Sequence, residues 1–328
     1  MNKLMKISVL MILICFLLLV FLSSGVLAAE NNYPKKPIKL VVPYNPGGGS
    51  DISARIFAKY SLEYFGQPLI VVNISGAGGS VGGQEVLNSN PDGYTLFWHH
   101  AAMHVSYHTG IADFTWDSFT PICQTASVTD AIIVSPDAQW NTIEELMTYI
   151  KENPGKLKLG VTLGATTHFE AYQMDIASGG DNINIIACGG DADKITKLLG
   201  GHVDAISVTI SSGIDFIKAG EVKALAITAL ERNSYIPNIP TIIESGFDVV
   251  NVRSYNVFAP KGLSQDISDI ISKTFEKMTK DERIVKELTK LTITPAYRNQ
   301  EQSIPNLLEE DATYYKITRF AKFKGLMK

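Results

Sequence analysis

Several features that would mark particular classes of protein are scarce in this sequence. It holds three cysteines in 328 residues, too few for a disulfide framework. One lies in the apolar N-terminal run; we expect Cys123 and Cys188 to be small buried apolar residues, although an exported chain permits a disulfide between them. With 29 Lys and Arg against 33 Asp and Glu, and no basic run, the chain shows no sign of nucleic-acid binding. An apolar content of 45% excludes a disordered chain.

The N-terminus has the order of a secretory signal. Basic residues Lys3 and Lys6 precede the apolar run Val9–Leu22, and small residues follow it. We predict a signal peptide over residues 1–28, and hence an exported chain in the periplasm or at the outer face of the cytoplasmic membrane. The alternative is an uncleaved anchor, because the run approaches the length that spans a bilayer.

The first part of the mature chain alternates between strands and helices. Ile38–Tyr44 is a β-branched run that predicts a buried strand, and apolar residues from Ile52 to Tyr64 repeat at helical spacing before a stop at Gly66. Two further strands are predicted at Leu69–Val72 and Tyr94–Trp98. Such alternation is typical of an α/β fold with a mostly parallel sheet. A chain of 328 residues is longer than one core usually serves, so we expect two lobes.

The alternation resumes after about residue 127. Thr142 and Glu145 form a capping box that opens a helix. The strands predicted here are Leu157–Val161, Ile183–Ala187, Val203–Val208 and Val222–Ala229, with helices after Gly164 and at Asp191–Leu199. Beyond Pro260 the pattern turns helical, at about Gln265–Met278, Asp281–Leu291 and Glu301–Arg319.

Two glycine turns, Pro46–Asp51 and Gly76–Gly79, each lie between a predicted strand and a predicted helix. In open α/β sheets the crevice at the carboxyl ends of the strands is where ligands bind. Glycines let the backbone approach a ligand closely, and a helix amino end favours an anion. Only Arg55 is nearby, inside the helix, so we expect backbone amides to hold a carboxylate there.

Two other interpretations of these turns are weaker. Gly76–Gly78 begins like a dinucleotide fingerprint, but Val81 stands where the third glycine belongs, and the first turn lacks the lysine of a phosphate loop. Simple loop geometry would explain one turn. Two similar turns at equivalent places in one sheet make that explanation less attractive.

A set of motifs in fixed order resembles the tripartite tricarboxylate transporter receptor family, also called Bug receptors. The motifs are Pro43–Asp51, Gly66–Pro68, Asn73, Gly76–Gly79, Pro91–Leu96, Gly155–Leu157, Leu198–Gly201, Val203–Asp204, Lys218–Gly220, Ala224–Ala226, Pro240–Thr241 and Ala259–Pro260. They cover essentially the whole mature chain, and the ordered set is highly specific.

The resemblance implies an α/β, two-lobed type 2 periplasmic-binding-protein fold with a cleft between the lobes and two crossover strands. We place the crossings near 124–130 and 250–256, with lobe one at 29–126 plus 254–328 and lobe two at 127–253. The implied function is capture of a small organic carboxylate (a di- or tricarboxylate, an acidic amino acid or an aromatic acid) for a membrane transporter.

The resemblance also implies which residues bind the ligand. The predicted residues of lobe one are Tyr44, Gly48, Gly49, Ser50, Asp51, Gly76, Ala77, Gly78 and Gly79. Those of lobe two are Thr166, Thr167, His168, Gly190 and Asp204. We add His99, because His99-His100 stands where the family usually has a small Gly-Thr pair; two imidazoles there would hydrogen-bond a ligand or add positive charge at low pH.

Three further features leave alternatives open. Ala187–Gly190 stands where a Pro-Tyr-Lys-Gly motif is common in the family. The tyrosine and lysine of that motif are absent, so other residues must contact the far end of the ligand. Arg253, on the second crossing, is either a salt-bridged arginine or a contact to a distal carboxylate. His100, His104 and His108 align at helical spacing, which suggests a metal; however, Gly110 leaves room only for a short turn, and we predict no metal site.

The sequence also bounds the function. We see no nucleophile elbow, paired metal motif or phosphate loop, so we predict a binding protein that acts as a monomer, without cofactor or catalytic residues. The partners expected are the carboxylate ligand and membrane transporter subunits. The alternatives are a ligand-sensing partner of a membrane receptor and, less in keeping with the motifs, an exported enzyme acting on a carboxylate.

Overall fold

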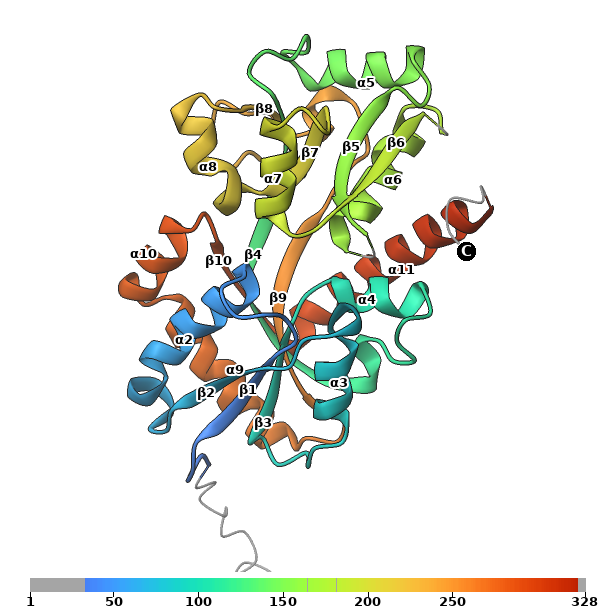
Figure 1. The fold of residues 1–328 in the computed structure, drawn as a ribbon. Helices are drawn as coiled ribbons and strands as arrows, with labels where there is room; N and C mark the ends of the chain where they lie inside the picture. Colours follow the sequence, from blue (N-terminus) through green and yellow to red (C-terminus); the bar gives the residue numbers. More distant parts are fainter. Residues whose placement is uncertain (1–32, 164, 181, 324–328) are drawn as a thin grey trace, which may run out of the picture. The chain divides into compact units, whose positions relative to one another are not determined.

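The computed structural model describes residues 33–163, 165–180 and 182–323. The predicted signal peptide therefore lies outside the described residues. From Pro34 onward the chain forms one compact unit that contains two groups of strands and helices (Figure 1). No helix in the described ranges is both long and apolar enough to cross a membrane.

The first group is built around β1, which lies between two parallel neighbours. The strands β1 (Ile38–Val42), β2 (Leu69–Asn73) and β3 (Thr95–His99) lie in the order β2-β1-β3. The helices that follow them are α2 (Gly49–Phe65), α3 (Ser80–Leu87) and α4 (Ala102–His108). Helix α2 ends where Gly66 takes the left-handed conformation, φ +68°, and its N–H donates to Leu62 O. The predicted stop at Gly66 is thus confirmed.

Two strands pass between the groups. β4 (Phe119–Val134) pairs antiparallel with β9 (Val252–Pro260) over Phe119–Thr129, and with β7 (Ala205–Thr209) over Asp130–Val134. Figure 1 shows both β4 and β9 running from the first group into the second. They are the two crossover strands that the sequence predicted.

The second group repeats the α/β pattern. Its strands β5 (Leu157–Thr162), β6 (Ile183–Cys188), β7 and β8 (Lys223–Ile227) form the order β4-β7-β5-β6, with β8 paired to β4. Its helices are α5 (Ile143–Glu152), α6 (Thr166–Ala177), α7 (Asp191–Leu199) and α8 (Ile210–Ala219). Cys188 of β6 and Cys123 of β4 are both free thiols. Cys123 is buried as predicted, whereas the prediction is wrong for Cys188, which is only partly buried.

The C-terminal segment returns to both groups. It consists of α9 (Gln265–Thr279), α10 (Glu282–Lys290), β10 (Thr294–Asn299) and α11 (Gln300–Phe323). β10, which the sequence analysis did not predict, pairs antiparallel with β4. Helix α11 packs against α4 of the first group and α6 of the second.

The prediction of a mostly parallel sheet is wrong for the crossover strands. Parallel pairing holds inside each group, for β1 with β2 and β3, and for β5 with β6 and β7. Every pairing of β4 and β9 is antiparallel. A strand that enters a parallel sheet directly from another lobe needs no right-handed crossover helix, so alternation of strands and helices does not predict its direction.

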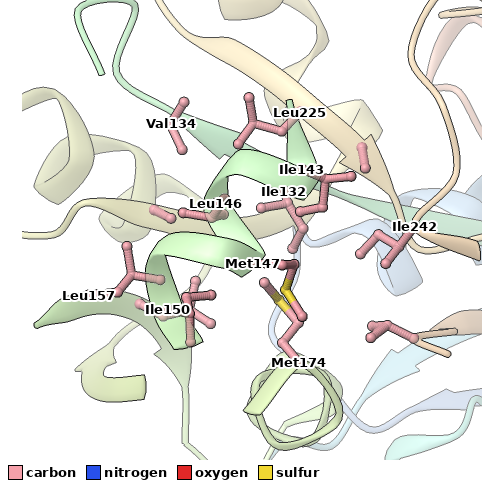
Figure 2. Close-up of a cluster of buried hydrophobic side chains, with 14 of the residues drawn as sticks. Ile132, Val134, Ile143, Leu146, Met147, Ile150, Leu157, Met174, Leu225 and Ile242 are labelled. Carbon is pink, nitrogen blue, oxygen red and sulfur yellow. The ribbon is translucent and has the colours of Figure 1, made fainter. Parts of the chain in front are cut away.

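The core of the second group lies between α5, α6 and the sheet (Figure 2). Helix α5 buries Ile143, Leu146, Met147 and Ile150, each at most 1% exposed, and Figure 2 shows Met147 pointing toward Met174 of α6. The spacing of three and four residues places all four side chains on one helix face. Packing of this face fixes α5 against the sheet.

The predicted capping box lies at the amino end of α5, where Thr142 and Glu145 both accept backbone hydrogen bonds. Thr142 Oγ1 accepts the N–H of Glu145 at 3.2 Å, and Glu145 Oε2 accepts the N–H of Asn141 at 2.6 Å. We expect Thr142→Ala to lower the free energy of unfolding by about 1 kcal/mol, because one helix N–H loses its acceptor. Thr142→Ser keeps the oxygen and is the control. Equal urea midpoints for the alanine and serine variants would contradict the assignment.

Candidate functional site

Both glycine turns leave the first sheet at one edge. The last paired residues of the parallel neighbours β1 and β2 are Val42 and Asn73. The chain therefore turns into α2 and toward α3 side by side, at the carboxyl ends of the strands. The first N–H groups of a helix have no partner within it, so this edge presents backbone donors and the positive ends of helix dipoles. Such an edge favours an anion.

Asp51 shapes the first turn from inside. Its Oδ2 accepts the N–H of Gly47 at 2.8 Å, and its Oδ1 accepts Asn73 Nδ2 and Arg55 Nε, each at 2.9 Å. Burial alone would raise the pKa of Asp51, but these hydrogen bonds and the charge of Arg55 lower it below its usual value. The carboxylate faces the protein, and Arg55 is occupied by Asp51 and by Asn73 Oδ1, at 2.9 Å. The free donors at this edge are therefore backbone N–H groups rather than the Arg55 guanidinium.

The second turn has an unusual backbone. All four residues of Gly76–Gly79, the alanine included, have positive φ, from 45° to 139°. A Cβ on Gly78 would lie 2.5 Å from Ser106 Oγ, and one on Gly79 would lie 2.8 Å from His99 Nε2. Glycine is therefore needed at both positions for two reasons: the backbone has positive φ, and neighbouring side chains leave no room for a Cβ.

The two consecutive histidines lie behind this edge. His99 is 1% exposed, its Nδ1 accepts the N–H of His100 at 2.7 Å, and burial lowers its pKa to about 3. The His100 ring stacks on Tyr44 with centroids 5.1 Å apart and meets Tyr255 edge to face. Burial lowers the pKa of His100 well below its usual value too. Both imidazoles are neutral near pH 7 and supply no positive charge. Of the two, His100 is the less buried.

The second sheet has a matching edge. β5 and β6 are parallel and end in register at Thr162 and Cys188. Helix α6 begins at Thr166, followed by Thr167 and His168, and α7 begins after Gly190. The Thr162 hydroxyl donates to Gly189 O, which ties the two turns together. This edge places the predicted lobe-two residues Thr166, Thr167, His168 and Gly190 at neighbouring helix amino ends.

The side chains at this second edge are mostly committed to the protein. Thr167 Oγ1 accepts the N–H of Thr162 at 3.2 Å, and Asp191 accepts the N–H and hydroxyl of Thr209 at 3.1 and 2.7 Å. Burial alone would raise the pKa of Asp191, but Lys194, 2.8 Å away, lowers it to about 2. The Asp191–Lys194 ion pair is thus internally balanced.

Comparison with known proteins identifies the chain. The profile of the tripartite tricarboxylate transporter family receptor matches residues 53–318. The chain belongs to this receptor family. A UPF0065 protein in the gbd 5′ region of Cupriavidus necator is 30% identical to the receptor over 278 residues, 84% of each chain.

Solved structures of other proteins have the same fold. A TctC solute-binding protein from Polaromonas has a TM-score of 0.77 and 29% identity, covering 88% of this receptor and 99% of that chain. MatC from Rhodopseudomonas palustris, solved with bound malate, shares the fold with a TM-score of 0.75 at 22% identity, over 87% of this receptor and 100% of that chain. These likenesses confirm the two-lobed fold of a type 2 periplasmic binding protein.

Asp204 does not lie with the other predicted site residues. It precedes β7, and its Oδ2 accepts the N–H of Lys158 at 2.8 Å, near the amino end of β5. The edge with Thr166 and Gly190 lies at the carboxyl ends of these parallel strands, a strand length away. The structure therefore separates Asp204 from the candidate site of the receptor.

Arg253 forms a buried ion pair on the crossover strands, which is one of the two alternatives that the sequence left open; its acidic partner was not predicted. Arg253 of β9 donates to Asp130 of β4, whose side chain is fully buried. Asn251 donates to both Asp130 Oδ2, at 3.1 Å, and Glu170 Oε2 of α6, at 2.8 Å. The available signal was an isolated acid, Asp130, directly before the apolar run Ala131–Val134.

Two further histidines, His104 and His108, pair with acids of α11. His104 Nδ1 lies 3.1 Å and His108 Nε2 2.9 Å from Asp311 Oδ1, and Glu310 lies 3.5 Å from His104 Nε2. Burial alone would lower the pKa of His104, but the two carboxylates raise it. Both histidines lie on α4, a seven-residue helix where a short turn was predicted. The pairs hold α11 onto the first group.

Proposed function

We propose that this receptor is exported, captures a small organic carboxylate in its cleft and delivers it to a tripartite tricarboxylate-type transporter. The observation that carries the proposal is the adjacency of two glycine turns at the ends of β1 and β2. Backbone N–H groups and helix dipoles meet there, and the nearby Arg55 is engaged elsewhere. A carboxylate matches such a site in charge and in hydrogen-bonding capacity.

The proposed binding residues fall on the two edges described above. In lobe one they are Tyr44, Gly48, Gly49, Ser50, Gly76, Ala77, Gly78 and Gly79, with Asp51 and His99 acting through the shape of the two turns. In lobe two they are Thr166, Thr167, His168 and Gly190. The first set binds the carboxylate head group, and the second meets the ligand when the cleft closes.

We place lobe one at 29–126 plus 254–328 and lobe two at 127–253. The pairing of β4 supports this division, since β4 changes partner from β9 to β7 at Asp130. Closure is a hinge motion on β4 and β9, driven by contacts that the ligand makes only in the closed state. A monomer suffices for this cycle, which includes no chemical step and needs no cofactor.

A binding role, rather than catalysis, fits the ionisable groups at the lobe-one edge. His99 and His100 are neutral, and Asp51 is held by three donors. None of these groups is placed as an activated nucleophile–base pair. Transport therefore ranks above turnover of the bound carboxylate.

Isothermal titration of the purified receptor against di- and tricarboxylates, acidic amino acids and aromatic acids tests the proposal. Malate belongs in the panel, because it is bound in a structure of the same fold. We expect at least one carboxylate to bind with a Kd of about 1 μM or tighter, which corresponds to roughly 8 kcal/mol. Absence of binding across the panel would overturn the proposed function.

A further inference from the structure

Several buried hydrogen-bond donors have no partner among the described residues, and two of these belong to Tyr44, just after β1, and to the crossover strand β9. These two are the hydroxyl of Tyr44 and Nε of Arg253. Buried polar groups in proteins are nearly always hydrogen-bonded, because an unpaired donor loses its water without compensation. An acceptor at these positions would therefore be stabilising, and the closed cleft is where a ligand would supply it.

The two donors share one neighbourhood. Tyr44 lies two residues after the end of β1 and just before the first glycine turn, and its ring stacks on His100, which contacts Tyr255. Burial raises the pKa of Tyr44, and the charge of Arg253 acts against this rise. Arg253 also contributes to the lowered pKa of His100, after burial. Arg253 and Tyr255 are two residues apart on β9, so their side chains leave the same face of that strand. A Cβ on Gly49 would lie 3.3 Å from Tyr255 Oη, so this strand face also adjoins the first glycine turn.

The charge of Arg253 is already matched. Asp130 pairs with it, and the neighbouring acid Asp191 is paired with Lys194. A second carboxylate of the ligand at Arg253 would be the fourth acid, after Asp130, Asp191 and Glu170, in a buried cluster that holds two cations. Burying an unmatched charge costs more than a hydrogen bond returns. An uncharged hydroxyl or carbonyl oxygen accepts from both donors without that cost.

On the basis of the proposed function, we propose that Arg253, together with Tyr44, is a specificity determinant that donates hydrogen bonds to an uncharged oxygen of the ligand. The receptor then takes a hydroxy- or oxo-substituted carboxylate in preference to the unsubstituted acid. Asp130 positions Arg253 and neutralises it, so the pair recognises oxygen substitution rather than charge.

Matched ligand pairs test this inference by titration calorimetry. The pairs are malate with succinate, lactate with propionate, and 2-oxoglutarate with glutarate. In the pair whose carbon skeleton fits the cleft, we expect the oxygenated acid to bind about 10- to 100-fold more tightly, as for a hydrogen bond to a charged donor. A site built for a hydroxyl or carbonyl discriminates against the analogue that lacks it.

The variants separate ligand contact from folding. Arg253→Gln alone leaves the Asp130 charge buried and unpaired, so the informative protein is the double variant D130N/R253Q, which stays neutral. We expect the double variant to reduce the preference to within about 3-fold while binding of the unsubstituted acid changes little. Tyr44→Phe should reduce the preference as well; it is compared through the ratio of the two Kd values, because Tyr44 also belongs to the set proposed to bind the carboxylate head group of both acids. The control is R232Q/E244Q, which removes an exposed ion pair of 2.8 Å and should keep the preference.

The outcomes distinguish the proposed function from the role of Arg253 and Tyr44. If the wild-type receptor binds no carboxylate, the proposed function fails and this inference with it. If carboxylates bind but the wild type shows no preference for the oxygenated member, or if the preference persists in both folded variants, the inference alone is overturned. Tighter binding of succinate than of malate would likewise overturn it.

Discussion

Gly79→Ala should weaken carboxylate binding by about 100-fold or more, as loss of several preorganised hydrogen bonds to a charged group would. Gly79 has φ +101°, a conformation that L side chains rarely adopt. Its new Cβ would lie 2.8 Å from His99 Nε2 and 3.4 Å from Pro43 Cβ. His99 has little room to move, because it is buried and hydrogen-bonded to His100. The turn itself must shift, and with it the N–H groups that we assign to the ligand.

The matched control for this variant is Gly155→Ala. Gly155 also has positive φ, +71°, but a Cβ on this residue would have no other atom within 4 Å, and the residue precedes β5, away from both glycine turns. It carries the backbone cost of about 1–3 kcal/mol without the steric one, so its affinity should match the wild type. Titration calorimetry and thermal melting of all three proteins measure the comparison. A Gly79→Ala protein that melts normally and binds within about 3-fold of wild type would refute a role for this turn.

Local sequence signals predicted the two glycine turns of lobe one well. Glycines between a strand and a helix mark a turn whatever the rest of the chain does, and both turns, at Gly47–Gly49 and Gly76–Gly79, occur where expected. The stop at Gly66 and the cap at Thr142 have the same local character. Signals of this kind act within a few residues, so one sequence is enough to detect them.

Long-range pairing explains most of what was missed. β10 follows two amphipathic helices and gains its stability from pairing with β4, about 170 residues earlier in the chain. Strand propensity is weak without its partner. The same holds for α4, whose His104 and His108 meet Asp311 from α11. A short helix with few local signals forms because distant side chains hold it.

The buried charges show most clearly what local sequence signals cannot predict. Arg253 and Asp130 are separated by 123 residues, and neither has a local motif that indicates the other. Sequence alone left Arg253 between a salt bridge and a ligand contact. The structure shows the salt bridge, and the unpaired Nε supports a contact to an uncharged ligand oxygen in place of the distal carboxylate that the sequence suggested.

Glu170, next to the Arg253–Asp130 pair, should make the folded protein less stable as pH rises. Glu170 is 1% exposed on α6, and burial, followed by the nearby Asp130 carboxylate, raises its pKa from 4.5 to about 7. In the unfolded chain Glu170 loses its proton near its ordinary pKa, whereas the folded protein retains it until about pH 7. The free energy of unfolding therefore falls as pH rises through this window and levels off above it.

Glu170→Gln should remove this dependence. The amide oxygen can still accept from Asn251 Nδ2, which lies 2.8 Å from Glu170 Oε2, and no proton is exchanged. We expect the difference in unfolding free energy, variant minus wild type, to grow by about 3 kcal/mol between about pH 4.5 and pH 7.5, at about 1.4 kcal/mol per unit of pKa shift. Urea denaturation at several pH values measures it, and the exposed Glu152→Gln of α5 is the control, with a constant difference. A constant difference for Glu170→Gln as well would show that this carboxyl is ionised in the folded receptor. Asn251 would then bind two charged acids, and the buried cluster would hold more negative charge than Arg253 and Lys194 balance.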